Sequence, residues 1–175
     1  VEGKRPFPKS QPPHSCNKGL WGKPTVLNNA ETWATVPKII KNGADWYASM
    51  GNENAQGCKV WAISGNIKYN GLMELDMKTT FREAIDDYCG GIQKKKALKV
   101  IHVGGVTGGF LPPEKADTQT DYESLLDAGV LMGQASFAAY DDSACVIDLA
   151  LFSIGFNEGE TCGKCTPCRI GLTLI

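Results

Sequence analysis

Three cysteines in the segment Cys162-Gly-Lys-Cys165-Thr-Pro-Cys168 constrain this chain more than any other feature. The C-x₂-C-x₂-C spacing places three thiolates within about two turns of backbone, so one compact inorganic centre can be held by all three. Soft sulfur ligands favour an iron–sulfur cluster, Zn²⁺ or Cu(I) over hard cations. A ferredoxin run would place a fourth Cys four residues later, where Leu172 stands. The fourth ligand is therefore expected either elsewhere in the chain or beyond Ile175.

Structural zinc is the simpler alternative, because Cys₃His sites are common. His14 and His102 are the two histidines of the sequence, and neither lies at short spacing from the cysteines. The positive charges of Lys164 and Arg169 would stabilise anionic sulfur. These observations favour an iron–sulfur cluster over zinc.

The segment Glu160–Arg169, ETCGKCTPCR, resembles the E-S-C-G-K-C-x-P-C-R signature of the flavin-carrying, NADH-binding subunits of respiratory complex I. The same subunit type occurs in NAD(P)-linked hydrogenases and formate dehydrogenases. The resemblance implies that Cys162, Cys165 and Cys168 ligate a [4Fe–4S] cluster, with the fourth Cys beyond the end of this sequence. Ile170 departs from the acidic residue that is usual in the family.

A second segment, Gly22–Thr32, reads GKPTVLNNAET and resembles the family motif G-x-P-T-x-x-N-N-V-E-T. The resemblance implies that Asn28, Asn29 and Thr32 bind FMN. Amide side chains at a helix N-terminus suit a ribityl chain and a phosphate. It also implies that the main flavin and NADH glycine loops lie upstream of this sequence.

The same residues predict a helix that begins after an N-cap at Asn28, with Glu31 three positions later as in a capping box. The proline at position 37 predicts a break in that helix, and Asn42-Gly43 predicts its end. A short helix is expected over 44–50.

The middle of the chain predicts a hairpin, a helix capped by Thr79 or Thr80, and two further strands. Together they indicate an α+β fold with a small ubiquitin-like β-grasp domain flanked by helices. The segment Ser64–Gly71 resembles the S-G-x-V-x-x-P-G hairpin of the soluble-ligand-binding β-grasp module of the same family. The glycine-rich segment 104–109 matches no phosphate-binding motif and is interpreted as a structural loop. The expected strands are 58–64, 72–75, 98–103 and 136–140, and the expected helices are 81–89 and 143–156.

Three domains follow from these segments and the resemblance. Residues 1–56 are expected to be the end of a flavin- and NADH-binding domain, as a loop arm and a helix. Residues 57–140 form the β-grasp domain. Residues 141–175 begin a helical [4Fe–4S] domain that is truncated here.

Composition excludes several classes of function. A net charge of −1 gives no electrostatic reason to bind nucleic acid. Neither a membrane-spanning apolar run nor a signal peptide is recognisable. Seven cysteines, three of them in one motif, indicate a reducing compartment rather than a disulfide scaffold. A cytoplasmic location is expected, free or on a membrane-associated complex.

The resemblance implies an oxidoreductase subunit that passes electrons between NAD(P)H, FMN and a [4Fe–4S] cluster. Its implied partners are other subunits of a redox complex, including a thioredoxin-like [2Fe–2S] subunit. The 175 residues alone are expected to be inactive and to bind these cofactors poorly or not at all. The alternative is a non-catalytic β-grasp module that docks partner subunits. The choice between NAD and NADP and the terminal electron acceptor stay open.

Overall fold

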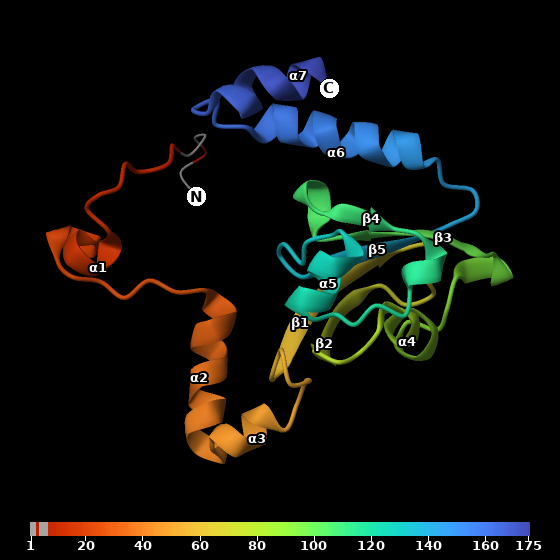
Figure 1. Ribbon diagram of the computed structural model, residues 1–175, viewed down its shortest axis with the longest axis horizontal. Coiled ribbons are helices and arrows are strands. Elements are labelled where there is room, and N and C mark those ends of the chain that lie inside the picture. The colour runs from red at the N-terminus through yellow and green to blue at the C-terminus, as the bar shows by residue number, and fades with distance from the viewer. Residues whose placement is uncertain (1–2, 4–6) are drawn as a thin grey trace.

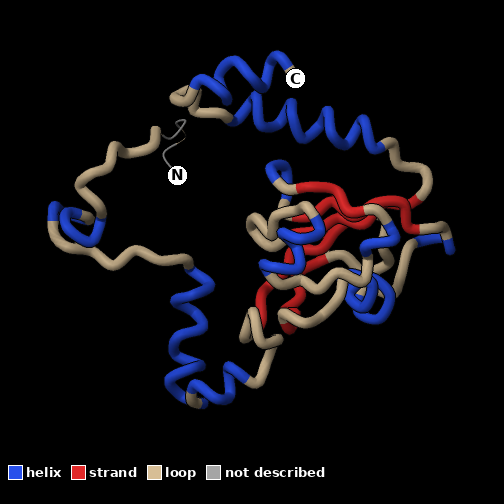
Figure 2. The backbone as a smooth tube through the Cα atoms, viewed as in Figure 1, coloured by secondary structure: helices blue, strands red, loops and turns tan. Residues whose placement is uncertain are grey.

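The computed structural model describes residue 3 and residues 7–175, and its centre is a five-stranded mixed sheet (Figures 1 and 2). The strand order is β2-β1-β5-β3-β4, and only the central pair β1 and β5 is parallel. This arrangement confirms the α+β, β-grasp expectation, with one strand more than predicted. The strands are β1 (Cys58–Gly65), β2 (Gly71–Asp76), β3 (Leu98–Val103), β4 (Gly109–Leu111) and β5 (Ser136–Asp141).

Helices flank the sheet before and after it in the chain. Figure 1 shows the arm with α1, α2 and α3 extending away from one side of the sheet, and α6 passing along another side before it meets α7. Among the described residues, no helix combines the length and the apolar character that crossing a membrane requires. The helices are α1 (Ser15–Lys18), α2 (Ala30–Asn42), α3 (Ala44–Ala48), α4 (Phe81–Glu83), α5 (Tyr122–Ala128), α6 (Val146–Glu160) and α7 (Leu172–Leu174).

Three aromatic rings form the centre of the core beneath the sheet. Trp61 of β1, Phe81 of α4 and Phe137 of β5 are almost completely buried. The rings of Phe81 and Phe137 meet edge to face with centroids 5.2 Å apart, and those of Trp61 and Phe81 do so at 5.8 Å. Burial of large apolar surface and edge-to-face ring contacts both stabilise the fold. The β-grasp unit therefore has its own core.

The helices that flank the sheet have far fewer buried side chains than the β-grasp unit has. Neither α2 nor α3 contains a buried residue, and Ser153 is the buried residue of α6. Large apolar side chains are exposed on the arm and α2, including Trp21 and Ile40, and on α6, including Leu151 and Phe152. Exposed apolar surface of this kind is typical of contacts with further protein.

The expectations for α2 are corrected at two points. The helix runs through Pro37 without a break. Proline removes one N–H donor, and the cap at Asn29 and the bond from Gly43 N to Ile39 O, 2.8 Å long, hold both ends of the helix. The N-cap is Asn29 rather than Asn28, because the Asn29 Oδ1 accepts from the N–H of Glu31.

Other elements differ in extent. The helix expected over 81–89 begins with a complete capping box at Thr80, but its second turn, Ala84–Tyr88, is π-helical. The helix α5 after the N-cap Asp121 and the strand β4 were not predicted. The helix α6 begins at Val146 and continues to Glu160, beyond the predicted 143–156.

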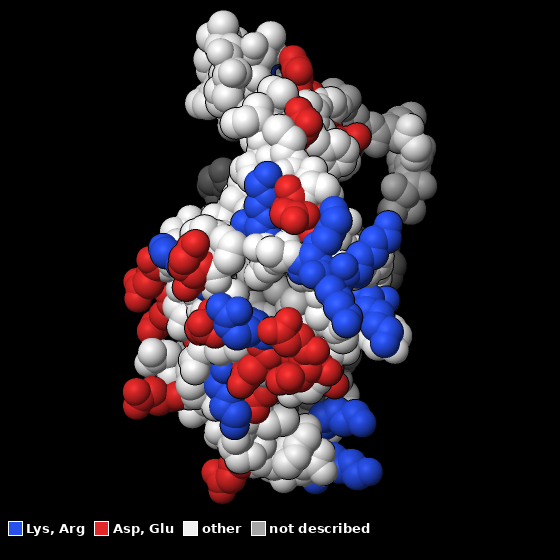
Figure 3. Space-filling view, turned by 90° about the vertical axis from the view of Figure 1, so that its right-hand side faces the viewer, with Lys and Arg blue, Asp and Glu red and all other residues white. Residues whose placement is uncertain are grey.

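Both signs of charge occur on the face drawn in Figure 3. Basic side chains, Lys or Arg, gather at one side of this face, and acidic side chains gather near its middle. This mixture agrees with the near-zero net charge of −1. The face offers no continuous basic surface of the kind that follows a nucleic-acid backbone.

Candidate functional site

Cys162 and Cys165 lie in the turn that follows α6, and Cys168 lies in the π-helical turn Pro167–Gly171 that leads into α7. Cys162 is half-buried, whereas Cys165 and Cys168 are exposed. The two helical segments pack side by side, and Thr173 Oγ1 donates to Glu158 Oε1 at 2.8 Å. The turn therefore sits at the tip of a helical hairpin that presents its thiols to an incoming group.

The turn has a defined backbone. Gly163 adopts a φ of +70°, which L side chains rarely adopt, and its N–H donates to Thr161 Oγ1 at 3.3 Å. Nη1 of Arg169 donates to the carbonyl oxygen of Gly163 at 2.8 Å. A glycine between the first two cysteines is thus required by the conformation of the loop.

The donor set fits a thiolate-ligated cluster in its chemistry and access. Three soft sulfur donors lie in one short segment of the chain. A cavity of about 300 Å³ beside Cys168 is lined by Asn157, Glu160 and Thr161. Within the described residues no three His, Cys, Asp or Glu side chains are gathered closely enough to hold a metal ion. Coordination would therefore require the three side chains to converge.

Histidine does not complete this set in the structure. The ring of His102 stacks on Phe110, with centroids 4.4 Å apart and an interplanar angle of 19°. Burial lowers the pKa of His102, although a hydrogen bond with the backbone of Gly105 opposes that effect. The His102 side chain therefore packs on the face of the sheet, as expected of a structural residue.

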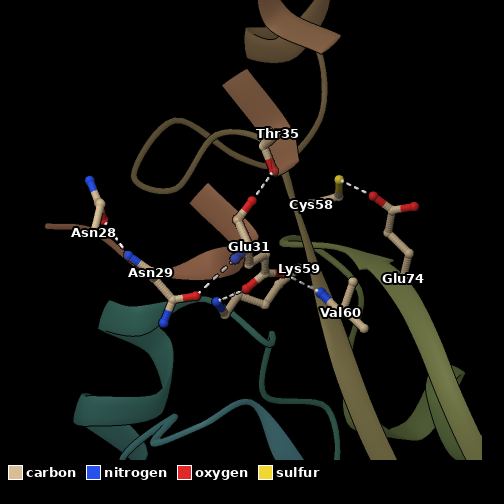
Figure 4. A network of polar contacts seen from close by, with 8 residues as sticks. All are labelled: Asn28, Asn29, Glu31, Thr35, Cys58, Lys59, Val60 and Glu74. Atoms are coloured by element: carbon tan, nitrogen blue, oxygen red, sulfur yellow. Dashed lines mark hydrogen bonds and ion pairs between the residues drawn. The ribbon is translucent and has the colours of Figure 1, made fainter. Parts of the chain in front are cut away.

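The predicted flavin residues lie at the first turn of α2, where Asn28, Asn29 and Thr32 are all exposed (Figure 4 labels the two asparagines). The Oδ1 of Asn28 accepts from the N–H of Asn29 at 2.7 Å, and the Oδ1 of Asn29 accepts from the N–H of Glu31 at 3.0 Å. Both carbonyl oxygens are thus used within the turn. The amide nitrogens remain as donors, which suits the oxygen-rich ribityl phosphate of a flavin.

Glu31 connects this turn to the sheet (Figure 4). Its carboxylate forms an ion pair with Lys59 and accepts a hydrogen bond from the N–H of Val60 at 2.8 Å. Burial alone would raise the pKa of Glu31, but the hydrogen bonds from Lys59 and Val60 and the lysine charge together lower it. The expected capping box is therefore wrong, because Glu31 faces β1 instead of the start of its own helix.

A cleft of about 210 Å³ lies between α2 and the sheet, lined by residues that include Glu31, Thr32, Lys59 and Cys58. Cys58 Sγ donates to Glu74 Oε1 at 2.9 Å. Burial, that hydrogen bond and nearby carboxylates raise the pKa of Cys58 to about 12. This thiol is therefore protonated and engaged, in agreement with a structural role.

The structure does not bring the two predicted sets together. Figure 1 places the start of α2 and the turn between α6 and α7 in separate parts of the molecule. The motifs predicted both sets, but not Lys59 and Val60 as the partners of Glu31. No local pattern marks that contact, since it joins residues 28 and 29 positions apart.

Comparison with known proteins supports the motif at the C-terminal end. Residues 148–175 match the family model described as the NADH-ubiquinone oxidoreductase-F iron-sulfur binding region. The chain is 44% identical over 171 residues to the NADP-reducing hydrogenase subunit HndC of Solidesulfovibrio fructosivorans, covering 98% of this chain and 35% of that protein. It is 39% identical over 172 residues to the NADH-quinone oxidoreductase F 2 subunit of Rhizobium meliloti, covering 98% of this chain and 41% of that protein.

A solved structure of similar fold is the NAD⁺-reducing [NiFe]-hydrogenase in the air-oxidized state. It superposes with a TM-score of 0.78 at 28% identity, covering 96% of this chain and 28% of that chain. The chain thus spans between 35% and 41% of the length of the two curated relatives.

Proposed function

We propose that this chain, a relative of the NADH-quinone oxidoreductase F subunits and of the hydrogenase subunit HndC, is part of a flavin- and iron–sulfur-containing oxidoreductase subunit. Its cofactors would be FMN and a [4Fe–4S] cluster, with NAD(P)H as the substrate. The observation that carries the proposal is the turn Cys162–Cys168, which lies within the region matched to the iron–sulfur family model.

When bound, FMN would supply the exchange between hydride transfer and single-electron transfer, and a [4Fe–4S] cluster would supply one-electron transfer. The residues of this chain bind and orient these groups. Cys162, Cys165 and Cys168 would hold the cluster as thiolates, and a cysteine outside this sequence would be the fourth ligand. Lys164 and Arg169 bring two positive charges close in sequence to these cysteines, and these charges would offset part of the negative charge of a thiolate-bound cluster.

At the start of α2, the amide nitrogens of Asn28 and Asn29 and the hydroxyl of Thr32 would bind the polar side of FMN. Glu31 keeps that turn against β1, so its donors have a fixed orientation. Preorganised donors lower the cost of ordering on binding.

We propose a reducing, cytoplasmic location, because three cysteines in one ligand motif suit such a compartment better than a disulfide scaffold does. We also propose that the natural partners are other subunits of a redox complex, one of them a thioredoxin-like [2Fe–2S] protein. The names of the relatives, which are subunits, support the first part of that proposal.

Docking of partner subunits is a second candidate function. The exposed apolar side chains of the arm and of α6 favour it, since such surface marks protein contacts. A docking role alone would need neither cluster nor flavin. The metal content of the full-length subunit therefore separates the two.

The test is iron, sulfide and zinc analysis of the full-length subunit, prepared without oxygen. Wild type is expected to contain about four irons and no zinc. Serine substitution of Cys162, Cys165 or Cys168 should lower the iron content strongly. The matched controls Cys16→Ser and Cys145→Ser, also exposed thiols, should leave it unchanged. Stoichiometric zinc, or unchanged iron in all three motif variants, would contradict the proposal.

A further inference from the structure

The guanidinium of Arg169 folds back over the cysteine turn. Its Nη1 donates to the carbonyl oxygens of Gly163 at 2.8 Å and Lys164 at 3.3 Å. Its Nη2 donates to Thr166 Oγ1 at 3.3 Å. One side chain thereby contacts both the segment between the first two cysteines and the segment between the last two.

These contacts orient two peptide groups. In a planar trans peptide the C=O and the following N–H point in opposite directions. The carbonyl groups of Gly163 and Lys164 face the guanidinium, so the N–H groups of Lys164 and Cys165 face away from it. Among the described residues, neither of these two N–H groups donates a hydrogen bond to another protein group. Both are available as donors to a bound group.

The shape of an arginine side chain suits this set of contacts. Its planar fork presents several N–H donors in fixed directions, whereas the ammonium of lysine is a compact point charge on a flexible stem. The backbone N–H of Arg169 also donates to the carbonyl oxygen of Cys165 at 3.0 Å, which fixes the residue relative to the second cysteine. The side chain is therefore held at one place on the turn from which it reaches three acceptors.

We propose that Arg169 is a positioning residue for the iron–sulfur cluster. By holding the carbonyls of Gly163 and Lys164, it directs the N–H groups of Lys164 and Cys165 to donate to cluster sulfur. The inference rests on the proposed cluster at the three cysteines. Hydrogen bonds to sulfur and nearby positive charge stabilise the more negative, reduced form, and so raise the reduction potential.

The experiment compares four variants of the full-length subunit. Arg169→Lys keeps the charge but loses the fork, and Arg169→Gln loses both. Thr166→Ala removes one of the three contacts. Arg82→Lys is the matched control, because it makes the same substitution at an arginine outside the turn, whose guanidinium pairs with Asp117. The readouts are the midpoint potential from a redox titration followed by electron paramagnetic resonance, and the rate of cluster reconstitution from iron and sulfide.

Arg169→Lys is expected to lower the midpoint potential and to weaken cluster retention on the order of tenfold, as loss of an outer-shell partner does. Arg169→Gln should lower the potential further. Arg82→Lys should reconstitute at the wild-type rate and keep the wild-type potential, since the clamp is intact. A fall in potential at constant charge is the result that general loss of folding would not produce.

An Arg169→Lys subunit with wild-type potential and wild-type reconstitution overturns the inference and leaves the proposed function standing. A wild-type subunit without iron overturns both. If Arg169→Lys holds no cluster at all, Thr166→Ala decides the question. Reconstitution slower than wild type then supports the clamp, and an unchanged rate overturns it.

Discussion

The carboxylate of Glu31, in the first turn of α2, accepts a hydrogen bond from the backbone N–H of Val60 in β1 at 2.8 Å (Figure 4). Together with the ion pair to Lys59, this contact joins the helix to the sheet. Because α2 has no buried residue, polar contacts of this kind carry much of its attachment. The orientation of the proposed flavin residues therefore depends on Glu31.

Glu31→Gln is expected to loosen α2 from the sheet. The neutral amide loses the ion pair and a charge-assisted bond, which together stabilise by about 1 kcal/mol at a partly exposed site. Hydrogen exchange of residues 30–42 should become faster, while exchange in β3 and β5 stays the same. The control is Glu53→Gln, at an exposed glutamate outside this contact. Equal protection of α2 in both variants would show that Glu31 does not anchor the helix.

Substitution of Asn29 separates its two proposed roles. Asn29→Asp keeps an oxygen that caps the helix but replaces the amide donor with a negative charge. It should retain the helix and release flavin from the full-length subunit. Asn28→Leu, which leaves the cap in place, should also lower the flavin-to-protein ratio. Circular dichroism and flavin absorbance measure the two properties, and an unchanged flavin ratio in both variants would refute the assignment.

Phe137→Ala is expected to destabilise the β-grasp core by about 3–5 kcal/mol, because it removes a buried ring and leaves a cavity. The matched control is Phe152→Ala, whose ring is 66% exposed. It should shift the urea midpoint of the 175-residue chain little. Similar midpoint shifts for the two variants would mean that Phe137 is not a core residue.

The pKa of Cys58, raised to about 12, predicts an unusual labelling profile. An ordinary thiol, with a pKa near 8.5, approaches its maximum rate of alkylation by about pH 10. The rate for Cys58 should still rise about tenfold per pH unit there, because its thiolate fraction remains small. Peptide mass spectrometry after iodoacetamide pulses measures this rate. A plateau by about pH 9 would contradict the environment described for this thiol.

Acid should weaken the attachment of α5 through Asp121. Burial alone would raise the pKa of this carboxylate, but hydrogen bonds from Ser124 and Asn52 lower it below its usual value. A lowered folded pKa contributes stability above the unfolded value of about 3.9, and this stability is lost as the pH falls through the folded pKa. Unfolding free energies from pH 6 down to pH 2.5 should therefore fall less steeply for Asp121→Asn than for wild type. Parallel curves would exclude this contribution.

The sequence predicted elements whose signal is local. The hairpin of β1 and β2 and the helix cap at Thr80 follow from local patterns, and each is present in the structure. The strand β4 was not predicted because it is only three residues long, Gly109–Leu111, begins at the end of the glycine-rich segment 104–109 and is held by pairing with β3. Likewise, the helix α2 is continuous through Pro37 because backbone groups at each of its two ends have hydrogen-bond partners. No local sequence rule predicts this continuity.

In the candidate site, too, local patterns could be predicted from the sequence, whereas contacts that depend on the path of the chain could not. The spacing of Cys162, Cys165 and Cys168 predicts that they act as one ligand set, because ligand chemistry depends on residue type and interval. The clamp by Arg169 depends on the path of the turn, including the positive φ of Gly163, and so required coordinates. Coordinates were also required to find the partners of Glu31, because its sequence position is equally compatible with a capping box.

Anaerobic reduction of the full-length subunit by NADH or NADPH, followed by electron paramagnetic resonance and flavin absorbance, tests the proposed electron path from end to end. In wild type we expect bleaching of the flavin together with the signal of a reduced [4Fe–4S] cluster. In Cys165→Ser we expect that the flavin still bleaches and that the cluster signal is lost. An identical cluster signal in wild type and Cys165→Ser would contradict the claim that this turn holds the electron-accepting cluster.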